Sequence, residues 1–332
     1  MTTSTITQVP PGTQAYYDRT LLERAVPADV HGRFGQNRPL ATKNGNQIKF
    51  RRYSALTPAT TALTEGVTPT GSSLSVTDIT ATLAQYGDFV TISDMVDLVN
   101  QDPVLTEAGK VLGEQGGTTI DQVRRDVLVA GSSLIRANGS ARTDINTVMD
   151  EADLKTAIRA LDRQNAKFVT EMVKASGGTG TTPIRPAYIG IIHPDTLPIL
   201  EAITGFKSVE TYGSQMDAME DEVGAYRNIR FVKSTNAKIW TDGGASGGSN
   251  VISTGGTLAD VYATLIIAAN AYGVCPLSGQ AMRNIIKPLG SAGSADPLDQ
   301  RATSGWKAIT TTKILNDSWM IRIEHACPSA LS

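Results

Sequence analysis

One short stretch of the sequence could support nucleophilic chemistry. Residues Gly244-Ala245-Ser246-Gly247-Gly248 match the G-x-S-x-G pattern of a nucleophile elbow. An elbow needs a buried strand before the serine and a helix after it, because that sharp turn exposes the hydroxyl. Here Asp242-Gly243 precedes the match and Ser249-Asn250 follows it, and all four residues favour loops. A serine hydrolase that uses Ser246 is therefore only an alternative interpretation.

The histidines and cysteines are not spaced as a metal or redox site. His31, His193 and His325 lie far apart, and none belongs to an HExxH or HxH arrangement. We expect each to be a hydrogen-bonded or capping side chain. Cys275 and Cys327 are distant from each other and form no CxxC pair, so we expect two free thiols, buried or half-buried.

Two further patterns have simple structural interpretations. Asp150, Glu151 and Asp153 could bind a metal, but acidic residues at the start of a helix also stabilise its dipole. Gly177-Gly178-Thr179-Gly180 lacks the Gly-Lys-Ser/Thr ending of a phosphate-binding loop and the fingerprint of a dinucleotide site. We expect no catalytic residue, no bound metal and no cofactor.

The composition excludes several other classes of protein. The chain has 332 residues, 40% of them hydrophobic, and a formal net charge of −2 with both signs interspersed. This pattern is not that of a basic nucleic-acid-binding tail or a polybasic membrane anchor. No window approaches the roughly 18 apolar residues of a membrane span, and the N-terminus does not resemble a signal peptide. We expect synthesis in the cytosol.

The N-terminal part predicts an arm followed by a long hairpin. Prolines are scattered through residues 1–43, which predicts an extended arm with one short helix near Tyr16 to Ala25. Asn44-Gly45 predicts a tight turn, and the alternation of Ile48 and Phe50 with charged residues predicts a strand.

The partner strand is expected after a Thr/Pro/Gly/Ser-rich tip at Thr57 to Ser73. Leu74 and Val76 alternate, and Ile79, Ala81 and Leu83 continue in the opposite phase, which predicts a bulge or strong twist. A projecting hairpin of this length is marginal unless something else covers it.

Two helices and a linker are expected next. Asp102-Pro103 begins an apolar stripe that predicts one long helix over about residues 103–132, kinked or divided at Gly116-Gly117. Leu154, Ile158 and Leu161 predict a second helix from about Glu151 to Lys167. The flexible segment from Ser176 to Pro183 is the expected domain boundary.

The C-terminal half predicts strands without a regular βαβ repeat. We expect strands at Tyr188 to Ile192, Ile229 to Val232 and Val261 to Ala268, with a helix after the first that is capped by Asp195. A Gly/Ser-rich loop runs from Thr241 to Gly256. A last hairpin is expected to pair Trp306 to Ile314 with Trp319 to Glu324, where Trp319, Ile321 and Ile323 share one face. The fold class is α+β.

Several of these stretches resemble major capsid proteins of tailed bacteriophages, in particular the N4-type family. The residues that carry the resemblance are Tyr86 to Asp94, Asp102-Pro103, Tyr188 to Asp195, Gly305-Trp306-Lys307 and Arg322-Ile323-Glu324. The resemblance implies an HK97-like capsid fold. Its parts would be an N-terminal arm at 1–43, an extended β-hairpin loop at 44–92, a peripheral domain with a spine helix at 93–183 and 285–332, and an axial domain at 184–284.

The implied function is self-assembly through pentamers and hexamers into an icosahedral shell around the double-stranded DNA genome. The hairpin would lie over an adjacent subunit. Its charged residues would either pair with that subunit or form a solvated strand face. The candidate contact residues are Ile48, Lys49, Phe50, Arg51, Arg52, Glu65, Leu74, Val76, Asp78 and Leu83. Because the net charge is close to zero, we expect the DNA to be enclosed without tight or sequence-specific binding.

Portal, scaffold and decoration proteins are further candidate partners, and the expected location is the virion, after synthesis in the host bacterial cytoplasm. An encapsulin-like shell around protein cargo is the nearest alternative. A phage tail or decoration protein would be dominated by β-strands and would lack the helix at 103–132.

Overall fold

The fold was obtained as a computed structural model. It describes residues 29–95, 104–172, 184–213, 218–247, 250–291 and 296–329. The helix expected near Tyr16 to Ala25 and the linker from Ser176 to Pro183 lie outside the described residues. Helix and strand segments are mixed along the chain, as expected of an α+β protein.

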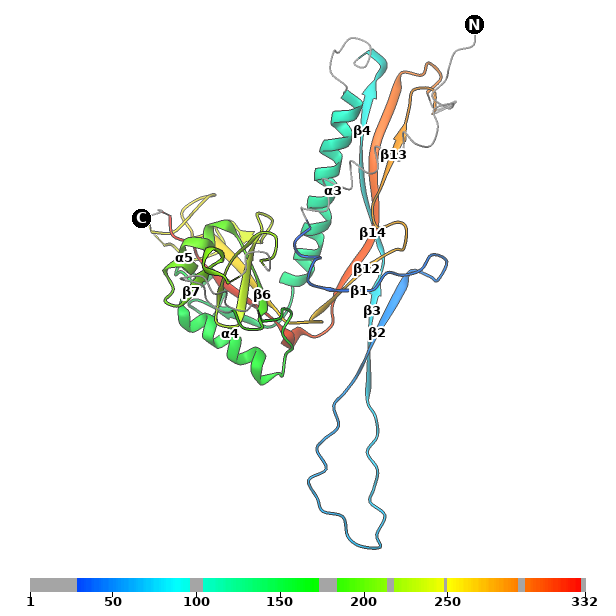
Figure 1. The fold of residues 1–332 in the computed structure, drawn as a ribbon. Coiled ribbons are helices and arrows are strands. Elements are labelled where there is room, and N and C mark those ends of the chain that lie inside the picture. The colour runs from blue at the N-terminus through cyan, green and yellow to red at the C-terminus, as the bar shows by residue number, and fades with distance from the viewer. Residues whose placement is uncertain are drawn as a thin grey trace.

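A long helix and a five-stranded sheet, here called the long sheet, run side by side (Figure 1). The helix α3 spans Val104–Val129 without a break. Gly116 lets it approach the sheet, because a Cβ there would lie 3.0 Å from the Trp306 ring. The glycines therefore mark a close contact and do not divide the helix. The strands of the long sheet are β1 (Gln36–Asn37), β12 (Tyr272–Pro276), β14 (Arg301–Ile314), β13 (Arg283–Lys287) and β4 (Ala84–Ser93).

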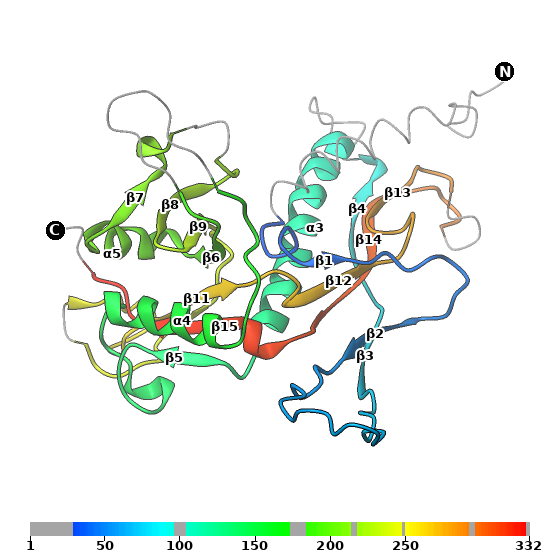
Figure 2. The same ribbon diagram turned by 60° about the horizontal axis from the view of Figure 1, so that its bottom comes forward.

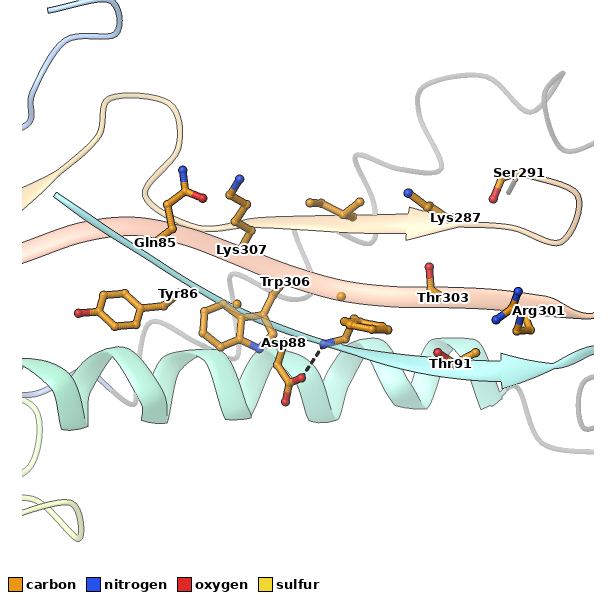
Figure 3. A pocket seen from close by; sticks show the side chains of 14 residues that line it. Gln85, Tyr86, Asp88, Thr91, Lys287, Ser291, Arg301, Thr303, Trp306 and Lys307 are labelled. Atoms are coloured by element: carbon orange, nitrogen blue, oxygen red, sulfur yellow. Dashed lines mark hydrogen bonds between the residues drawn. The ribbon is translucent and has the colours of Figure 1, made fainter. Parts of the chain in front are cut away.

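The central strand β14 explains how α3 is held. Its buried even-numbered residues face the helix, where Trp306 and Ala308 pack with Leu112 and Ile120. The indole Nε1 of Trp306 also donates to Oε1 of Gln115 at 3.0 Å. The opposite face of β14 carries the odd-numbered residues, and Lys307 on it points away from α3 (Figure 3).

An eight-stranded sheet with two helices forms a separate lobe beside α3 (Figure 2). Apolar residues on both of its faces are buried, one set against α4 and the other against the end of α3 and β12. Its strands are β5 (Leu134–Arg136), β15 (Met320–His325), β11 (Val261–Ile267), β6 (Tyr188–Ile192), β9 (Ile229–Lys233), β8 (Glu222–Tyr226), β7 (Phe206–Ser208) and β10 (Ile239–Trp240), and its helices are α4 (Glu151–Arg163) and α5 (Leu197–Ala202).

The start of α4 accounts for the acidic cluster noted in the sequence. Asp150 is the N-cap: its side chain accepts from the backbone N–H of Asp153, whose side chain accepts from the N–H of Asp150 in return. Leu154 and Leu161 on the same helix are completely buried. The capping box therefore accounts for the two aspartates, and Glu151 pairs with Lys155 at 2.9 Å.

Among the described residues, short 3-10 helices lie in the connections between the larger elements: η3 (Arg142–Asp144), η4 (Pro194–Thr196), η5 (Val209–Thr211) and η9 (Asp317–Trp319). The expected cap at Asp195 is wrong in detail. His193 is the N-cap of η4, and its ring Nδ1 accepts from the N–H of Asp195.

The expected C-terminal hairpin is wrong. β14 pairs with β4, β12 and β13, whereas β15 pairs with β11 and β5 in the lobe. The N–H groups of Leu315 and Asn316 both donate to the carbonyl of Ala271, at 2.8 and 3.0 Å. These bonds hold the chain where it passes from one sheet to the other. Ile321 and Ile323 do share one buried face with Trp319, as expected.

The strands also group differently from the expected domain ranges. β5, α4 and β15, all in ranges expected to be peripheral, belong to the lobe, whereas β12 from the expected axial range belongs to the long sheet. β4, from the expected hairpin range, pairs with β14 over residues 84–93. The expected domains were continuous residue ranges divided at loops. Such ranges could not predict which sheet each strand joins, because the chain passes between the two sheets several times.

Candidate functional site: the projecting loop and a groove on the long sheet

The hairpin expected from the sequence forms and extends well away from the rest of the molecule (Figure 1). It consists of β2 (Gln47–Tyr53), the connection 54–75 and β3 (Val76–Thr82), here together called the projecting loop. The strands pair without a register shift from Gln47 opposite Thr82 to Tyr53 opposite Val76. Of the two expected features, a bulge or a strong twist, the bulge is therefore wrong. Val76 lies on the opposite face of β3 from Ile79 and Ala81. An apolar side chain can stand on either face there, because both faces of the strand are exposed toward the tip.

The base of the projecting loop packs against its own chain. A Cβ at Gly273 in β12 would lie 2.7 Å from the Phe50 ring, so the ring rests on this glycine. Ala81, which pairs with Ile48, is only 2% exposed. Ile48, Phe50 and Leu83, which are half-buried, therefore fix the direction in which the loop leaves the long sheet.

Two of the expected charge partners already pair with each other. Arg51 and Asp78 lie opposite across the two strands, and the guanidinium donates to the carboxylate at 2.9 and 3.1 Å. The hydrogen bond from Arg51 lowers the pKa of Asp78. Lys49, Arg52 and Glu65 are exposed. Glu65 is the single charged residue between 54 and 75.

The outer part of the loop exposes apolar side chains that no described residue covers. Leu74 and Val76 were expected contact residues, whereas Tyr53 at the end of β2 was missed. Three others were missed because isolated apolar residues in a connection rich in Thr, Pro and Gly show no strand or helix period. Each of the following is at least 44% exposed: Tyr53, Leu56, Leu63, Val67, Leu74 and Val76. Exposed apolar side chains that gather on one part of a surface are a feature of interaction sites in general.

A groove of about 730 Å³ lies along the long sheet (Figure 3). Gly87 and Gly305 leave its floor without side chains, and Phe89 beside them is 66% exposed. Gln85, Lys287 and Lys307 point away from α3, whereas Trp306 and Asp88 point toward it. The lining residues are Gln85, Tyr86, Gly87, Asp88, Phe89, Thr91, Ile285, Lys287, Ser291, Arg301, Thr303, Gly305, Trp306 and Lys307.

Asp88 is engaged on the helix side of this groove. Its carboxylate accepts from the side-chain amide of Gln115 at 2.6 Å and from the N–H of Phe89 at 2.8 Å. These hydrogen bonds, that from Gln115 above all, lower the pKa of Asp88. The carboxylate therefore ties β4 to α3 and does not face a ligand in the groove.

Ser246 does not stand at a nucleophile elbow. It is exposed and forms an isolated bridge with Leu258, and its carbonyl accepts from the side-chain amide of Asn146 at 3.1 Å. The neighbouring N–H groups of Gly244 and Ala245 bond to Ala259 and Ile145, which makes this segment part of a loop framework. The serine lacks the strand-to-helix setting that the chemistry requires.

The remaining chemistry-bearing residues are packed into the fold. Cys275 and Cys327 are free and buried, and burial raises the pKa of their thiols to about 11 and about 12. His31 is buried against Asp121. Within the described part of the chain, no three His, Cys, Asp or Glu side chains gather as metal ligands would.

Sequence comparisons identify no relative of this chain: no protein-family model matches it, and no curated protein sequence does. Comparison of the fold with solved structures finds bacteriophage heads. The capsid of the cyanophage P-SCSP1u is 14% identical with a TM-score of 0.59, covering 89% of this chain and 87% of that one. The Ralstonia phage GP4 capsid is 11% identical with a TM-score of 0.62, at the same coverage.

The head structure of the Helicobacter pylori bacteriophage KHP40 is also similar, at 13% identity and a TM-score of 0.56, covering 88% of this chain and 87% of that one. The chain has a bacteriophage capsid fold. This capsid fold confirms the general resemblance that the sequence indicated, whereas the N4-type subgroup stays an expectation. Among the described helices of the capsid fold, none is long and apolar enough to span a membrane.

One histidine of the capsid fold predicts a pH dependence of stability. His325 is fully buried, with its Nδ1 2.9 Å from the carbonyl oxygen of Ala326 and its Nε2 3.0 Å from Thr264 Oγ1. Burial lowers the pKa of His325 to about 4. In the unfolded chain the pKa of this histidine is about 6.5. The stabilisation from the buried neutral ring is therefore complete above about pH 6.5. The free energy of unfolding declines as the pH falls toward 4, by about 3 kcal/mol in all.

We therefore expect His325→Gln to have a shallower loss of unfolding free energy between pH 7 and pH 4.5 than the unmodified protein. Denaturant unfolding at the two pH values measures this difference. Equal pH dependence in the two proteins would contradict the assignment of the shift to His325.

Proposed function

We propose that this chain is the shell subunit of a tailed bacteriophage, assembling through pentamers and hexamers into an icosahedral capsid around double-stranded DNA. The observation that carries the proposal is the projecting loop, whose apolar side chains have no cover within the described chain. A hairpin that extends alone into water is marginal, so this geometry requires a neighbour. Because the fold is similar to that of solved phage capsids, we take the neighbours to be further copies of this chain.

The loop of each copy would lie over an adjacent copy. Its contact side chains would be the exposed apolar set, with Lys49, Arg52 and Glu65 as the charged residues free of the Arg51–Asp78 pair. Such a contact joins two different surfaces of identical subunits. Contacts of this head-to-tail kind close into rings when the rotation allows it, and rings of five and six can close a shell.

We assign the parts of an HK97-like subunit according to the two sheets of the structure, and not according to the residue ranges expected from the sequence. The extended loop would be residues 47–82. The peripheral part would be α3 with the long sheet, in which α3 is the spine helix, and the axial part would be the eight-stranded lobe. The arm would end at β1, which pairs with β12.

The enclosed partner would be the DNA genome, held without sequence-specific contacts, as the net charge of −2 suggests. Portal, scaffold and decoration proteins are the further partners that a tailed-phage shell would need. The subunit would be made in the bacterial cytoplasm and would reside in the virion.

Size-exclusion chromatography with negative-stain electron microscopy of the purified full chain tests this proposal. We expect rings of five or six copies or uniform closed particles. A monomer that persists across protein and salt concentration would contradict it. Closed shells isolated with protein cargo and no nucleic acid from cells that produce the phage would favour the encapsulin-like alternative.

A further inference from the structure

We propose that the side of the long sheet turned away from α3 binds an acidic, extended segment of a second protein. We call it the basic face and define it by Arg283, Lys287, Arg301, Lys307, Lys313 and the exposed ring of Phe89. The proposal goes beyond shell assembly and does not depend on it, because the surface is complete within one chain.

The charge on this face has one sign. Side chains alternate between the two sides of a strand, so the odd-numbered residues of β4, β13 and β14 all point away from α3. Every charged residue among them is basic, and the neutral ones include Gln85, Thr91 and Thr303. The acidic residue of β4, Asp88, is on the other side with Gln115.

Several of these cations have no acidic partner among the described residues. Arg301 pairs with Asp296 at 3.6 Å. In the described part of the chain, Lys287, Lys307 and Arg283 take part in no ion pair. Arg283 lies directly opposite Lys307 in the ladder of β13 and β14. Like charges in that position destabilise a sheet, and a bound anion would relieve the repulsion.

The shape of the groove favours a peptide in extended conformation. Gly87 and Gly305 add no side chains to the groove, and the exposed ring of Phe89 offers an apolar wall. Lys307, Lys287 (which pairs with Thr303) and Arg301 succeed one another along β14. They cover six residue steps, about 20 Å at the rise of a strand, so about six residues of an extended segment would pass all three.

Charge complementarity distinguishes the possible occupants. The tip of the projecting loop from a second copy would bring a single carboxylate, Glu65. That is too little for this face, so a segment with several carboxylates fits better. Duplex DNA fits less well, because its affinity comes from many phosphate contacts over a wide surface, and the lining of this groove is partly apolar.

The test is fluorescence anisotropy of the full chain with a labelled peptide of about twelve residues that alternates Glu and Leu. We expect saturable binding that weakens with salt, as screening of charged contacts requires. Lys287→Ala with Lys307→Ala should weaken it about tenfold or more, since charge-assisted hydrogen bonds are the strong ones. The matched control, Lys155→Ala with Lys233→Ala, removes two charges from the lobe and should bind like the unmodified protein.

Three results would overturn the proposal: no binding of the peptide, equal binding by the Lys287/Lys307 variant, or tighter binding of a short DNA duplex than of the peptide. Loss of ring or shell formation in that variant would assign the face to a second copy instead and would also overturn it. Thermal unfolding of the Lys287/Lys307 variant checks its folding separately. Because removal of Lys307 relieves the repulsion from Arg283, the melting temperature should rise. If no shells form but the peptide binds as expected, the proposed function fails and this inference stands.

Discussion

Replacement of Asp121 by Ala is expected to lower the free energy of unfolding by about 3–5 kcal/mol, the usual cost of breaking a buried, paired polar group. Asp121 is completely buried in α3 and accepts three hydrogen bonds. The N–H and the ring Nδ1 of His31 lie 2.7 and 2.9 Å from its Oδ1, and the side-chain amide of Asn236 lies 3.0 Å from Oδ2. One carboxylate thus joins the N-terminal segment, the helix and the lobe.

Equilibrium unfolding in denaturant measures this cost. The matched control is Asp126→Ala on the same helix. The side chain of Asp126 is half-exposed and pairs with Arg125 and Lys238 at the surface, so its loss should change stability by no more than about 1 kcal/mol. If Asp121→Ala costs as little as the control, the three-way junction does not hold the fold together.

Shortening the projecting loop should abolish assembly while leaving the subunit folded. Ser54 and Ser75 are joined by a hydrogen bond of 3.0 Å at the end of the paired strands. An Asn-Gly turn in place of residues 55–74 should therefore close the hairpin in register. The removed residues are all exposed and cover no part of the described chain, so the free energy of unfolding should change by about 1 kcal/mol or less. Particle formation should fall below detection in electron microscopy.

A second variant separates the length of the loop from its chemistry. Leu56, Leu63, Val67 and Leu74 can be replaced together by Ser, which keeps the chain length and Glu65. Each fully buried side chain of this size contributes about 1.5–3 kcal/mol, so losing four should reduce association by several orders of magnitude. Normal shells from either variant would show that the loop does not hold neighbouring copies together.

Local features of this fold could be predicted from the sequence because local pattern determines them. The stripe of apolar residues predicts α3, and the alternation around Ile48 and Phe50 predicts β2 with its antiparallel partner. Pairing over long distances could not be predicted. Alternation in Trp306 to Ile314 and in Trp319 to Glu324 shows two strands, but it does not show that each belongs to a different sheet.

The candidate site shows the same limit. Leu74 and Val76 were predicted because they follow a strand pattern, whereas Leu63 and Val67 were missed because they lie in a connection without one. The groove could not be predicted at all. Gly87, Phe89 and Gly305 come together only through the register of β4 on β14, which joins residues more than 200 positions apart.

We propose that this chain forms a shell in which each projecting loop lies on a neighbouring copy. Cryo-electron microscopy of particles assembled from the purified full chain would show the position of every loop. We expect closed shells built of five- and six-membered rings, with residues 54–75 of every copy covered by an adjacent one. Failure to assemble under any protein or salt concentration, or shells whose loops point freely into solvent, would contradict it.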